Sequence, residues 1–365
     1  MDISQRDVLI WLNSLGIGSS NIDKILIYFN DLLDLWNAEN KQIESMNTVS
    51  SKIKERIINN KNIGYLKEFF FNIEKSNIKI ITIYDENYPK RLRYIDYNPK
   101  VIYMKGNIIE EDNLAIAIVG SRKATSYGKW ACEKFTKELT DLGITIISGL
   151  ANGIDTVAHK SALDNGGRTI GVLGCGIDVV YPPNNLSLYR EMEKLGAIIS
   201  EFPLGTAPFP YNFPQRNRII SGMSMGVLVI EAQEKSGSLI TASHASEQGK
   251  DVFALPGNIN SIFSAGTNKL IRDGARPLLE LEDIIEEIYE LKQLKEKSKS
   301  NNIIDYSNFS ETEIQILRLL EDGPMHCDSI AYRSNLNISD VNSMLTILEL
   351  KGVIKELSGR VFCLY

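Results

Sequence analysis

The chain has 365 residues, of which 43% are hydrophobic and 24% are charged, and its net charge is −6. This length favours two or three folded units, and the two fractions are those of a soluble globular protein. The acidic balance counts against a nucleic-acid partner, although such binding needs only a local basic patch.

The N-terminus and the cysteines indicate the compartment. Residues 1–7 have no basic leader followed by an apolar core, so we expect no signal peptide, and no apolar run is long enough to span a bilayer. The cysteines lie far apart with no paired spacing, which argues against a zinc site or a disulfide framework: Cys132, Cys175, Cys327 and Cys363. We therefore expect a cytoplasmic protein with no membrane partner and no bound metal.

Residues 1–75 are predicted to form a helical domain. Apolar residues recur at helical spacing on both sides of a short turn, Gly16-Ile17-Gly18. Two helices joined by a Gly-hydrophobic-Gly turn resemble a helix-hairpin-helix unit, and we class the region as SAM/helix-hairpin-helix-like. Such a hairpin can offer backbone N–H groups to a DNA phosphate. A plain packing role is favoured here, because acidic residues dilute the basic ones: Asp31, Asp34, Glu39 and Glu44.

Residues 76–290 are predicted to form an α/β domain. A β-rich segment at residues 78–104 leads into a region where strands and helices alternate, a pattern typical of a doubly wound parallel sheet. The predicted strands are residues 116–120, 145–149, 169–174, 197–201, 227–231 and 252–255. The predicted helices are residues 127–142, 154–165, 186–195, 216–223, 239–248 and 267–273.

The turn after the first of these strands is the centre of the predicted site. An apolar run ends in Gly120, Ser121, Arg122 and Lys123, and a helix follows. Strand, glycine turn and helix aim backbone N–H groups and a helix dipole at an anion, and a guanidinium matches phosphate oxygens. Ligands of such sheets bind beyond the carboxyl ends of the strands. We therefore predict a phosphate-binding crevice along this edge, where small residues follow two more strands: Ser148, Gly149, Gly153, Gly174 and Gly176.

Two later segments are also suited to phosphate. Arg216, Asn217 and Arg218 follow Phe213 and a proline at a predicted helix start. Cations and an amide at a helix N-terminus suit a phosphate chain, and the Phe213 ring is available to stack on a base. Hydroxyls and a glycine open the next helix, which gives a second terminus of this kind: Ser236, Gly237, Ser238 and Thr241.

The sequence lacks the motifs of several enzyme classes. It has no Gly-x-x-x-x-Gly-Lys-Ser/Thr, no Gly-x-Gly-x-x-Gly after the first strand, and no Gly-x-Ser-x-Gly. Asp155 and His159 share a helix face, as carboxylates and imidazoles do in catalytic pairs, but no nucleophile is near them. We therefore expect no catalytic residue and no cofactor, and a structural role for His159.

The C-terminal part divides into a linker and a small domain. Residues 291–309 are polar and lysine-rich and are predicted to be a flexible linker. Residues 310–365 are predicted to be a winged-helix-like domain of three helices and a terminal hairpin, with capping-box spacing between Ser310 and Glu313. Its third helix, residues 339–350, carries acidic and neutral residues where a DNA-reading helix carries Arg or Lys. A protein-binding or structural role is therefore favoured.

Five ordered motifs in the α/β region resemble those of the DprA (Smf) family of DNA-processing proteins. They are Ile-Val-Gly-Ser-Arg at 118–122, a Ser-Gly-Leu-Ala-Asn-Gly segment at 148–159, Phe-Pro-Gln-Arg-Asn-Arg-Ile-Ile at 213–220, Ser-Gly-Ser-Leu-Ile-Thr at 236–241 and Ala-Leu-Pro-Gly at 254–257. The resemblance covers the whole α/β region in order, and both end domains fit the longer members.

The resemblance has implications for fold, function and site. It implies an extended Rossmann-like core that binds single-stranded DNA, forms homodimers and loads the RecA recombinase during natural transformation, with single-strand-binding protein as a further partner. It implies no enzymatic activity. It also implies that Gly120, Ser121 and Arg122 form the central phosphate pocket, with residues 216–218 nearby.

Two other functions stay open. The predicted sheet also resembles that of nucleotide phosphoribohydrolases, but their Pro-Gly-Gly-x-Gly-Thr-x-x-Glu motif is matched only in part by residues 256–260 and 264–267, without the glutamate. A mononucleotide-sensing module would use the same phosphate pocket. Release of a free base from a nucleoside monophosphate supports the enzyme, whereas affinity that grows with oligonucleotide length supports DNA binding.

Overall fold

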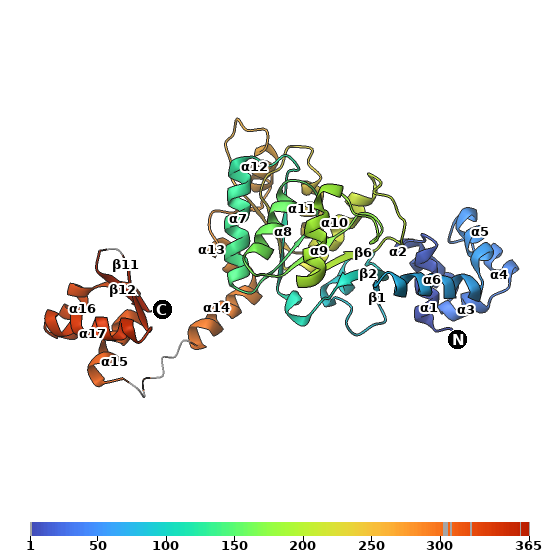
Figure 1. Cartoon of the computed structure of the whole chain (residues 1–365). Coiled ribbons are helices and arrows are strands. Elements are labelled where there is room, and N and C mark those ends of the chain that lie inside the picture. Colours follow the sequence, from blue (N-terminus) through green and yellow to red (C-terminus); the bar gives the residue numbers. More distant parts are fainter. Residues whose placement is uncertain (1, 302–305, 307–308, 322, 358, 365) are drawn as a thin grey trace. The chain divides into compact units, whose positions relative to one another are not determined.

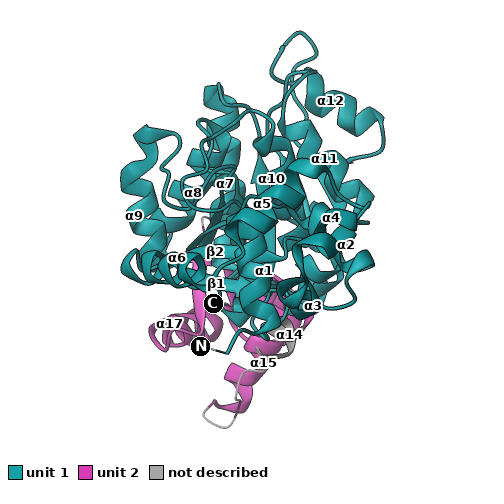
Figure 2. Ribbon diagram, turned by 90° about the vertical axis from the view of Figure 1, so that its right-hand side faces the viewer, with its two compact units in different colours: residues 1–295 teal, residues 296–365 magenta. Residues whose placement is uncertain are grey.

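The computed structural model describes residues 2–301, 306, 309–321, 323–357 and 359–364, except for the side chains of residues 297–301. These residues form two compact units, residues 1–295 and residues 296–365 (Figure 2). The first unit is a mixed α/β structure, and the second is a small helical domain with a three-stranded sheet (Figure 1).

The first unit is built on a nine-stranded sheet. Its strands are β1 (Lys79–Thr82), β2 (Val101–Gly106), β3 (Ala115–Val119), β4 (Thr145–Ser148), β5 (Thr169–Val172), β6 (Ala197–Ser200), β7 (Gly226–Val229), β8 (Asp251–Ala254) and β9 (Arg276–Pro277). Their order across the sheet is β1-β2-β6-β5-β4-β3-β7-β8-β9. The strands from β6 to β9 in this order are parallel, and β2 is antiparallel to both of its neighbours. The predicted doubly wound parallel sheet is confirmed.

The chain reverses its direction of travel across the sheet beside β3. From β3 it moves outward through β4, β5 and β6, and it then returns to place β7 on the other side of β3. Val119 pairs with Val229, so both of these strands end at the same level. Because the loops that follow β3 and β7 lead to opposite faces of the sheet, a crevice opens between them, as is usual at such a switch point.

Helices cover both faces of the sheet (Figure 1). Helices α7 (Ser126–Asp141), α8 (Ile154–Asp164) and α9 (Leu186–Leu195) lie on one face, and α10 (Asn212–Met223) and α11 (Ser238–Glu247) lie on the other. Successive side chains of a strand point to opposite faces. Accordingly, Ile116 and Ile118 pack with the α7 and α8 side chains, whereas Ala117 and Val119 pack with those of α10 and α11. The apolar run of β3 is thus buried on both sides, as its sequence predicts.

Shorter elements complete the α/β region. These are η1 (Lys90–Tyr94), η2 (Glu110–Asn113), η3 (Pro183–Asn185), α12 (Ala265–Arg272), α13 (Glu282–Ile285) and α14 (Tyr289–Asn301). Among the residues described, no helix combines the length and apolarity needed to cross a membrane.

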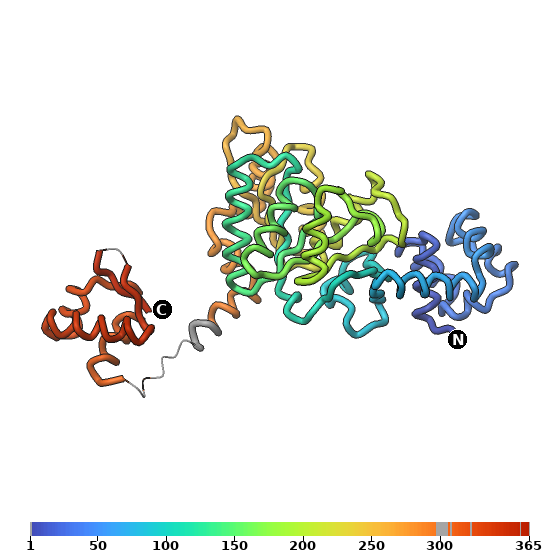
Figure 3. The backbone as a smooth tube through the Cα atoms, viewed as in Figure 1, coloured from blue at the N-terminus to red at the C-terminus, as the bar shows by residue number. Residues whose placement is uncertain are grey.

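Six helices precede the sheet and share its core. They are α1 (Gln5–Ser14), α2 (Ser19–Tyr28), α3 (Leu32–Asn37), α4 (Asn40–Ser45), α5 (Ser51–Asn60) and α6 (Ile63–Lys75), and they lie at the β1–β2 end of the sheet (Figure 3). Their apolar side chains form one cluster with Val101 and Tyr103 of β2. The Tyr103 hydroxyl donates to Asn13 Oδ1 at 2.7 Å, and Arg6 pairs with Asp85 at 2.9 Å. The predicted helical region and its turn between α1 and α2 are confirmed, whereas a domain boundary near residue 75 stays a prediction.

The second unit has winged-helix topology. Helices α15 (Glu311–Glu321), α16 (Cys327–Ser334) and α17 (Ile338–Leu350) pack around one apolar cluster. Strands β10 (Met325–His326), β11 (Ile354–Leu357) and β12 (Val361–Leu364) form a sheet in the order β10-β12-β11. The predicted capping box is present, because the Ser310 hydroxyl accepts from the Glu313 N–H and the Glu313 carboxylate accepts from the Ser310 N–H. The three predicted helices and the terminal hairpin are confirmed.

Two predicted boundaries are wrong. Helix α10 begins at Asn212 rather than at residue 216, because Pro214 lies in its first turn, where a missing N–H breaks no hydrogen bond. The predicted linker at 291–309 is helical in its first part, since α14 continues to Asn301. Its lysine, glutamate and glutamine residues are good helix formers, so a composition typical of a linker also permits a helix. Residues 302–305 and 307–308 of the predicted linker lie outside the described residues.

The buried carboxylate of Asp112 is predicted to be essential for stability. It is 4% exposed and accepts hydrogen bonds from Arg168, the Thr145 hydroxyl and the Ile109 N–H. Asp112→Ala removes the acceptor of the Thr145 hydroxyl and the Ile109 N–H and the counter-charge of Arg168, so we expect a loss of about 3–5 kcal/mol in the free energy of unfolding. Urea unfolding followed by tryptophan fluorescence measures this loss in the first unit alone, because all three tryptophans lie within residues 1–295.

The neighbouring exposed pair of Glu110 and Lys90 supplies the control. Its atoms are 3.5 Å apart and both side chains are mostly exposed, so Glu110→Ala should leave the unfolding midpoint unchanged. Equal shifts for the two variants would contradict the role given to Asp112.

Candidate functional site

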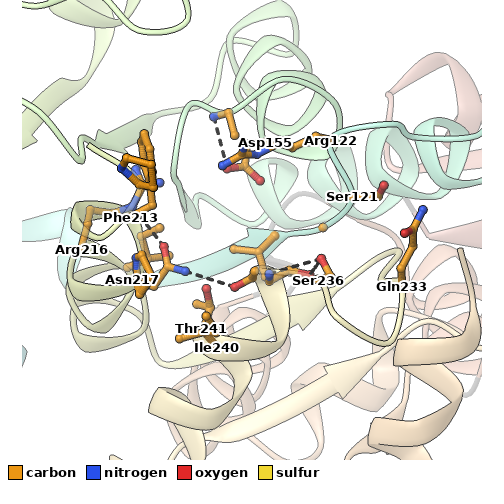
Figure 4. Close-up of a pocket in the computed structure, with 18 of the residues that line it drawn as sticks. Ser121, Arg122, Asp155, Phe213, Arg216, Asn217, Gln233, Ser236, Ile240 and Thr241 are labelled. Carbon is orange, nitrogen blue, oxygen red and sulfur yellow. Dashed lines mark hydrogen bonds between the residues drawn. The ribbon is translucent and has the colours of Figure 1, made fainter. Parts of the chain in front are cut away.

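A cavity of about 630 Å³ opens at the switch point between β3 and β7 (Figure 4). Its walls come from the turn after β3, the first turns of α10, and the segment that leads into α11. Most of the residues predicted to bind phosphate line it, together with Phe213, which is predicted to stack on a base: Gly120, Ser121, Arg122, Lys123, Arg216, Asn217, Ser236, Gly237, Ser238 and Thr241. The topology therefore brings together segments that are more than 100 residues apart in the chain.

Arg122 is an exposed cation at this cavity. Its guanidinium lies 5.6 Å from the centre of the Phe213 ring. Among the residues described, this guanidinium forms no ion pair and no hydrogen bond. Lys123 is also exposed and also lines the cavity. Both positive charges are thus available to an anion.

A close backbone contact holds the turn that carries Arg122. The Ile154 N–H donates to the Ser121 carbonyl at 3.1 Å, and the Lys123 N–H donates to the Ser121 hydroxyl at 3.1 Å. Gly153 has φ +82°, and a Cβ atom there would lie 2.2 Å from the Ser121 carbonyl oxygen. Only glycine permits this approach. Gly153 therefore allows the chain before α8 to pack directly against the turn that carries Arg122.

Two helix N-termini beside the cavity are already paired with carboxylates. The Thr125 N–H and hydroxyl, at the start of α7, donate to Glu231 at 2.9 and 2.5 Å. In α8, Asp155 lies in the first turn and accepts from the Ala151 N–H at 3.3 Å. The expectation that the α7 terminus offers its dipole to an anion is therefore wrong, because Glu231 already neutralises it. The first turns of α10 and α11 contain no acidic residue and keep their positive ends.

Arg216 is buried beneath the cavity rather than exposed in it. Only 4% of its surface is accessible, and its Nη1 donates to the Gly149 carbonyl at 2.7 Å and to the Val172 carbonyl. These bonds tie α10 to the ends of β4 and β5. Burial raises the pKa of the neighbouring Asp155 to about 6, and the Arg216 charge opposes this rise. Arg216 thus fixes the floor of the cavity.

The α11 side of the cavity consists of neutral polar groups. The Asn217 amide donates to the Gly237 carbonyl at 3.2 Å, which joins α10 to the segment before α11 (Figure 4). The hydroxyls of Ser236 and Ser238 lie 2.8 Å apart. Hydroxyls at a helix N-terminus can donate to phosphate oxygens.

The other predicted residues lie elsewhere. Gly149 and Gly174 line a smaller cavity of about 40 Å³ that shares Arg122 and Phe213 with the first. Four do not line either cavity: Ser148, Gly153, Gly176 and Arg218. The Ser148 hydroxyl donates to the Ile118 carbonyl at 2.6 Å, and the Gly176 N–H to the Thr206 carbonyl at 2.9 Å. Arg218 pairs with Glu201 at 2.5 Å, and both side chains are largely buried.

Among the residues of the cavity lining that the sequence does not predict, three carry polar groups on their side chains: Asp155, Tyr181 and Gln233. Asp155 and His159 share a helix face, but the His159 Nδ1 lies 2.6 Å from the Thr169 hydroxyl instead. Burial lowers the pKa of His159 to about 3, which agrees with a structural role. No local sequence pattern predicts Tyr181 and Gln233, because only the tertiary fold brings their loops to the cavity.

One group of potential metal ligands lies in the second unit, within the part of the chain that the structure describes. His326, Cys327 and Asp328 have ligand atoms within 4.8 Å of one another. The His326 ring nitrogen accepts from the Asp328 N–H and so caps α16, and Cys327 is buried. A consecutive trio in which one ligand caps a helix fits a structural role better than a metal centre.

Comparison with known proteins connects this geometry to a family. A family model described as DNA recombination-mediator protein A matches residues 79–289, and a DprA winged helix domain matches residues 307–360. Protein Smf of Synechocystis is 32% identical over 96% of both chains. DNA processing protein DprA of Bacillus subtilis is 44% identical over 59% of this chain and 73% of its own.

Solved structures agree with these sequence relatives. The X-ray structure of DprA from Streptococcus pneumoniae has a TM-score of 0.68 and 35% identity, and the match covers 79% of this chain and 99% of that one. DprA from Helicobacter pylori, described for its single-stranded DNA binding mode, has a TM-score of 0.53 and 31% identity over 60% of this chain and 96% of its own. On sequence, domain order and fold together, this chain belongs to the DprA (Smf) family.

Proposed function

We propose that this chain binds single-stranded DNA in the cavity at the β3–β7 switch point and acts in DNA processing during natural transformation. The observation that carries this proposal is the exposed and unpaired guanidinium of Arg122 at that cavity, among the described residues. The relatives named DNA processing protein DprA, and the Helicobacter pylori protein described as binding single-stranded DNA, support it.

The chemistry of the cavity suits a sugar-phosphate backbone. Arg122 and Lys123 supply positive charge, and the first turns of α10 and α11 supply helix dipoles without acidic residues. Such contacts recognise phosphates and carry no sequence information, so binding should be sequence-independent and should weaken with salt.

The predicted site residues then divide into two groups. We assign direct phosphate contact to the predicted residues that line the main cavity, apart from Phe213 and the buried Arg216: Gly120, Ser121, Arg122, Lys123, Asn217, Ser236, Gly237, Ser238 and Thr241. We assign a positioning role to the remainder of the predicted set: Ser148, Gly149, Gly153, Gly174, Gly176, Phe213, Arg216 and Arg218.

Further parts of the proposal rest on family membership alone. They are a homodimer, loading of the RecA recombinase, contact with single-strand-binding protein, and a cytoplasmic location. The N-terminal helices and the winged helix are proposed as packing or protein-binding domains, with domain boundaries near residues 75 and 290 and the winged-helix domain beginning at residue 310.

We propose binding without catalysis. Asp155 is the carboxylate in the cavity that an enzyme would use, since its pKa of about 6 suits a general acid. It already accepts the Ala151 N–H and faces Arg216, so it is committed to the structure. Incubation with nucleoside monophosphates should therefore release no free base, and release that is lost in Asp155→Asn would support the hydrolase alternative.

Arg122→Ala tests the phosphate site. With labelled poly-dT and fluorescence anisotropy, we expect at least a tenfold loss of affinity, because a phosphate loses its charged partner. The slope of log affinity against log salt should fall by about 0.7, the value of one phosphate contact on a single strand.

Arg272→Ala is the matched control for this test. It removes the same charge from a side chain that is 76% exposed, in the last turn of α12 and away from the cavity lining. An equal loss of affinity in both variants would mean that overall charge, rather than the cavity, governs binding.

Arg216→Ala should act through stability instead. It leaves the carbonyls of Gly149 and Val172 without their donor and Asp155 without its counter-charge, so we expect a loss of about 3–5 kcal/mol in the free energy of unfolding. Urea unfolding of Arg122→Ala should match the wild type. A fully stable Arg216→Ala variant would show that the buried bonds are dispensable.

A further inference from the structure

We propose that Tyr181, rather than Phe213, presents the open aromatic face on which an unpaired DNA base stacks. This inference rests on the proposed single-stranded DNA function and names a contact within that site. The ligand class is a nucleobase attached to a phosphate held by Arg122.

The ring of Phe213 is already surrounded. The guanidiniums of Arg122 and Arg216 lie 5.6 and 5.9 Å from its centre, and the Tyr181 ring lies 5.6 Å away at 32°. A Cβ atom on Gly174 would come within 2.7 Å of Phe213, so the ring also packs tightly against that backbone. Phe213 therefore supports Arg122 and Tyr181, and a base could reach it only by displacing one of them.

The Tyr181 side chain is accessible from the cavity, whereas the Phe213 ring is surrounded by other groups. It lines both the main and the smaller cavity, and 38% of its surface is accessible. Its hydroxyl has no hydrogen-bond partner among the described residues, and one side of its ring is supported by Phe213. The accessible part of the ring thus belongs to the same space as Arg122.

The backbone of Tyr181 is fixed in place. The hydroxyl of the buried Tyr189 donates to the Tyr181 carbonyl at 2.9 Å and accepts from its N–H at 3.3 Å. An aromatic ring held rigidly at a cavity loses little entropy when it binds, and a base offers a π-face whatever its identity. Stacking here would therefore add affinity without sequence preference.

A second exposed aromatic pair is less suited to this role. Phe209 and Tyr211 stack on each other at 5.4 Å and are 45% and 62% exposed. Neither lines the cavity, whereas Pro208 and Pro210, which alternate with them, do. Alternation along the segment directs the pair away from the phosphate site. Tyr211 is accordingly a good control for Tyr181.

The test compares a dT oligonucleotide with one of equal length in which abasic sites replace the thymidines. Anisotropy is measured for wild type, Tyr181→Ala, Tyr181→Phe and Tyr211→Ala in the full chain. We expect wild type to prefer dT over the abasic strand, and Tyr181→Ala to lose roughly tenfold on dT alone. Tyr181→Phe, which keeps the ring, and Tyr211→Ala should match wild type, and the salt slope should be the same for all four.

Three outcomes would decide against the proposal. The proposal is overturned if Tyr181→Ala keeps the preference for dT over the abasic strand. It is also overturned if Tyr211→Ala, rather than Tyr181→Ala, loses that preference. An equal loss on both strands would make Tyr181 a scaffold residue and overturn stacking as well. Failure of the proposed function can be distinguished from failure of the stacking proposal. If the proposed function is wrong, Arg122→Ala will not reduce the binding of either strand.

Discussion

The buried guanidinium of Arg216 is the interaction on which the rest of the site depends. It joins the first turns of α10 to the backbone beyond β4 and at the end of β5, two strands that belong to the opposite half of the doubly wound sheet. A buried arginine is stable only if its donors are satisfied, so these carbonyls and Asp155 specify one position for α10. That position sets the distance between Phe213 and Arg122, and with it the shape of the cavity.

Most of the charged groups and helix N-termini around the cavity are paired with a group of opposite charge. Glu231 neutralises the start of α7, Asp155 that of α8, and Glu201 pairs with Arg218. What remains is the charge of Arg122 and Lys123 and the positive ends of α10 and α11. Under the proposed function, a protein with a net charge of −6 would hold a phosphate chain at this cavity while its remaining surface discourages non-specific contact with DNA.

Much of this architecture could be predicted because it is local in sequence. The apolar run of β3 and the alternation of strands and helices predict the sheet, and the strand ends predict the edge at which the cavity opens. The different partners of Arg216 and Arg218 could not be predicted. Two residues two positions apart point to opposite sides of a helix, and their partners, Gly149 and Glu201, are assigned by the tertiary fold. Glu231 and Thr125, 106 residues apart, likewise meet only in the folded chain.

The central claim is that the single strand lies in the cavity at the switch point. Ultraviolet crosslinking of an oligodeoxythymidylate to the full chain, followed by mass spectrometry of the attached peptides, tests it most directly. The account predicts crosslinks in the peptides that contain Tyr181 and residues 208–218, beside Arg122. Crosslinks confined to the N-terminal helices α1–α6, or to the winged helix at 310–364, would contradict it.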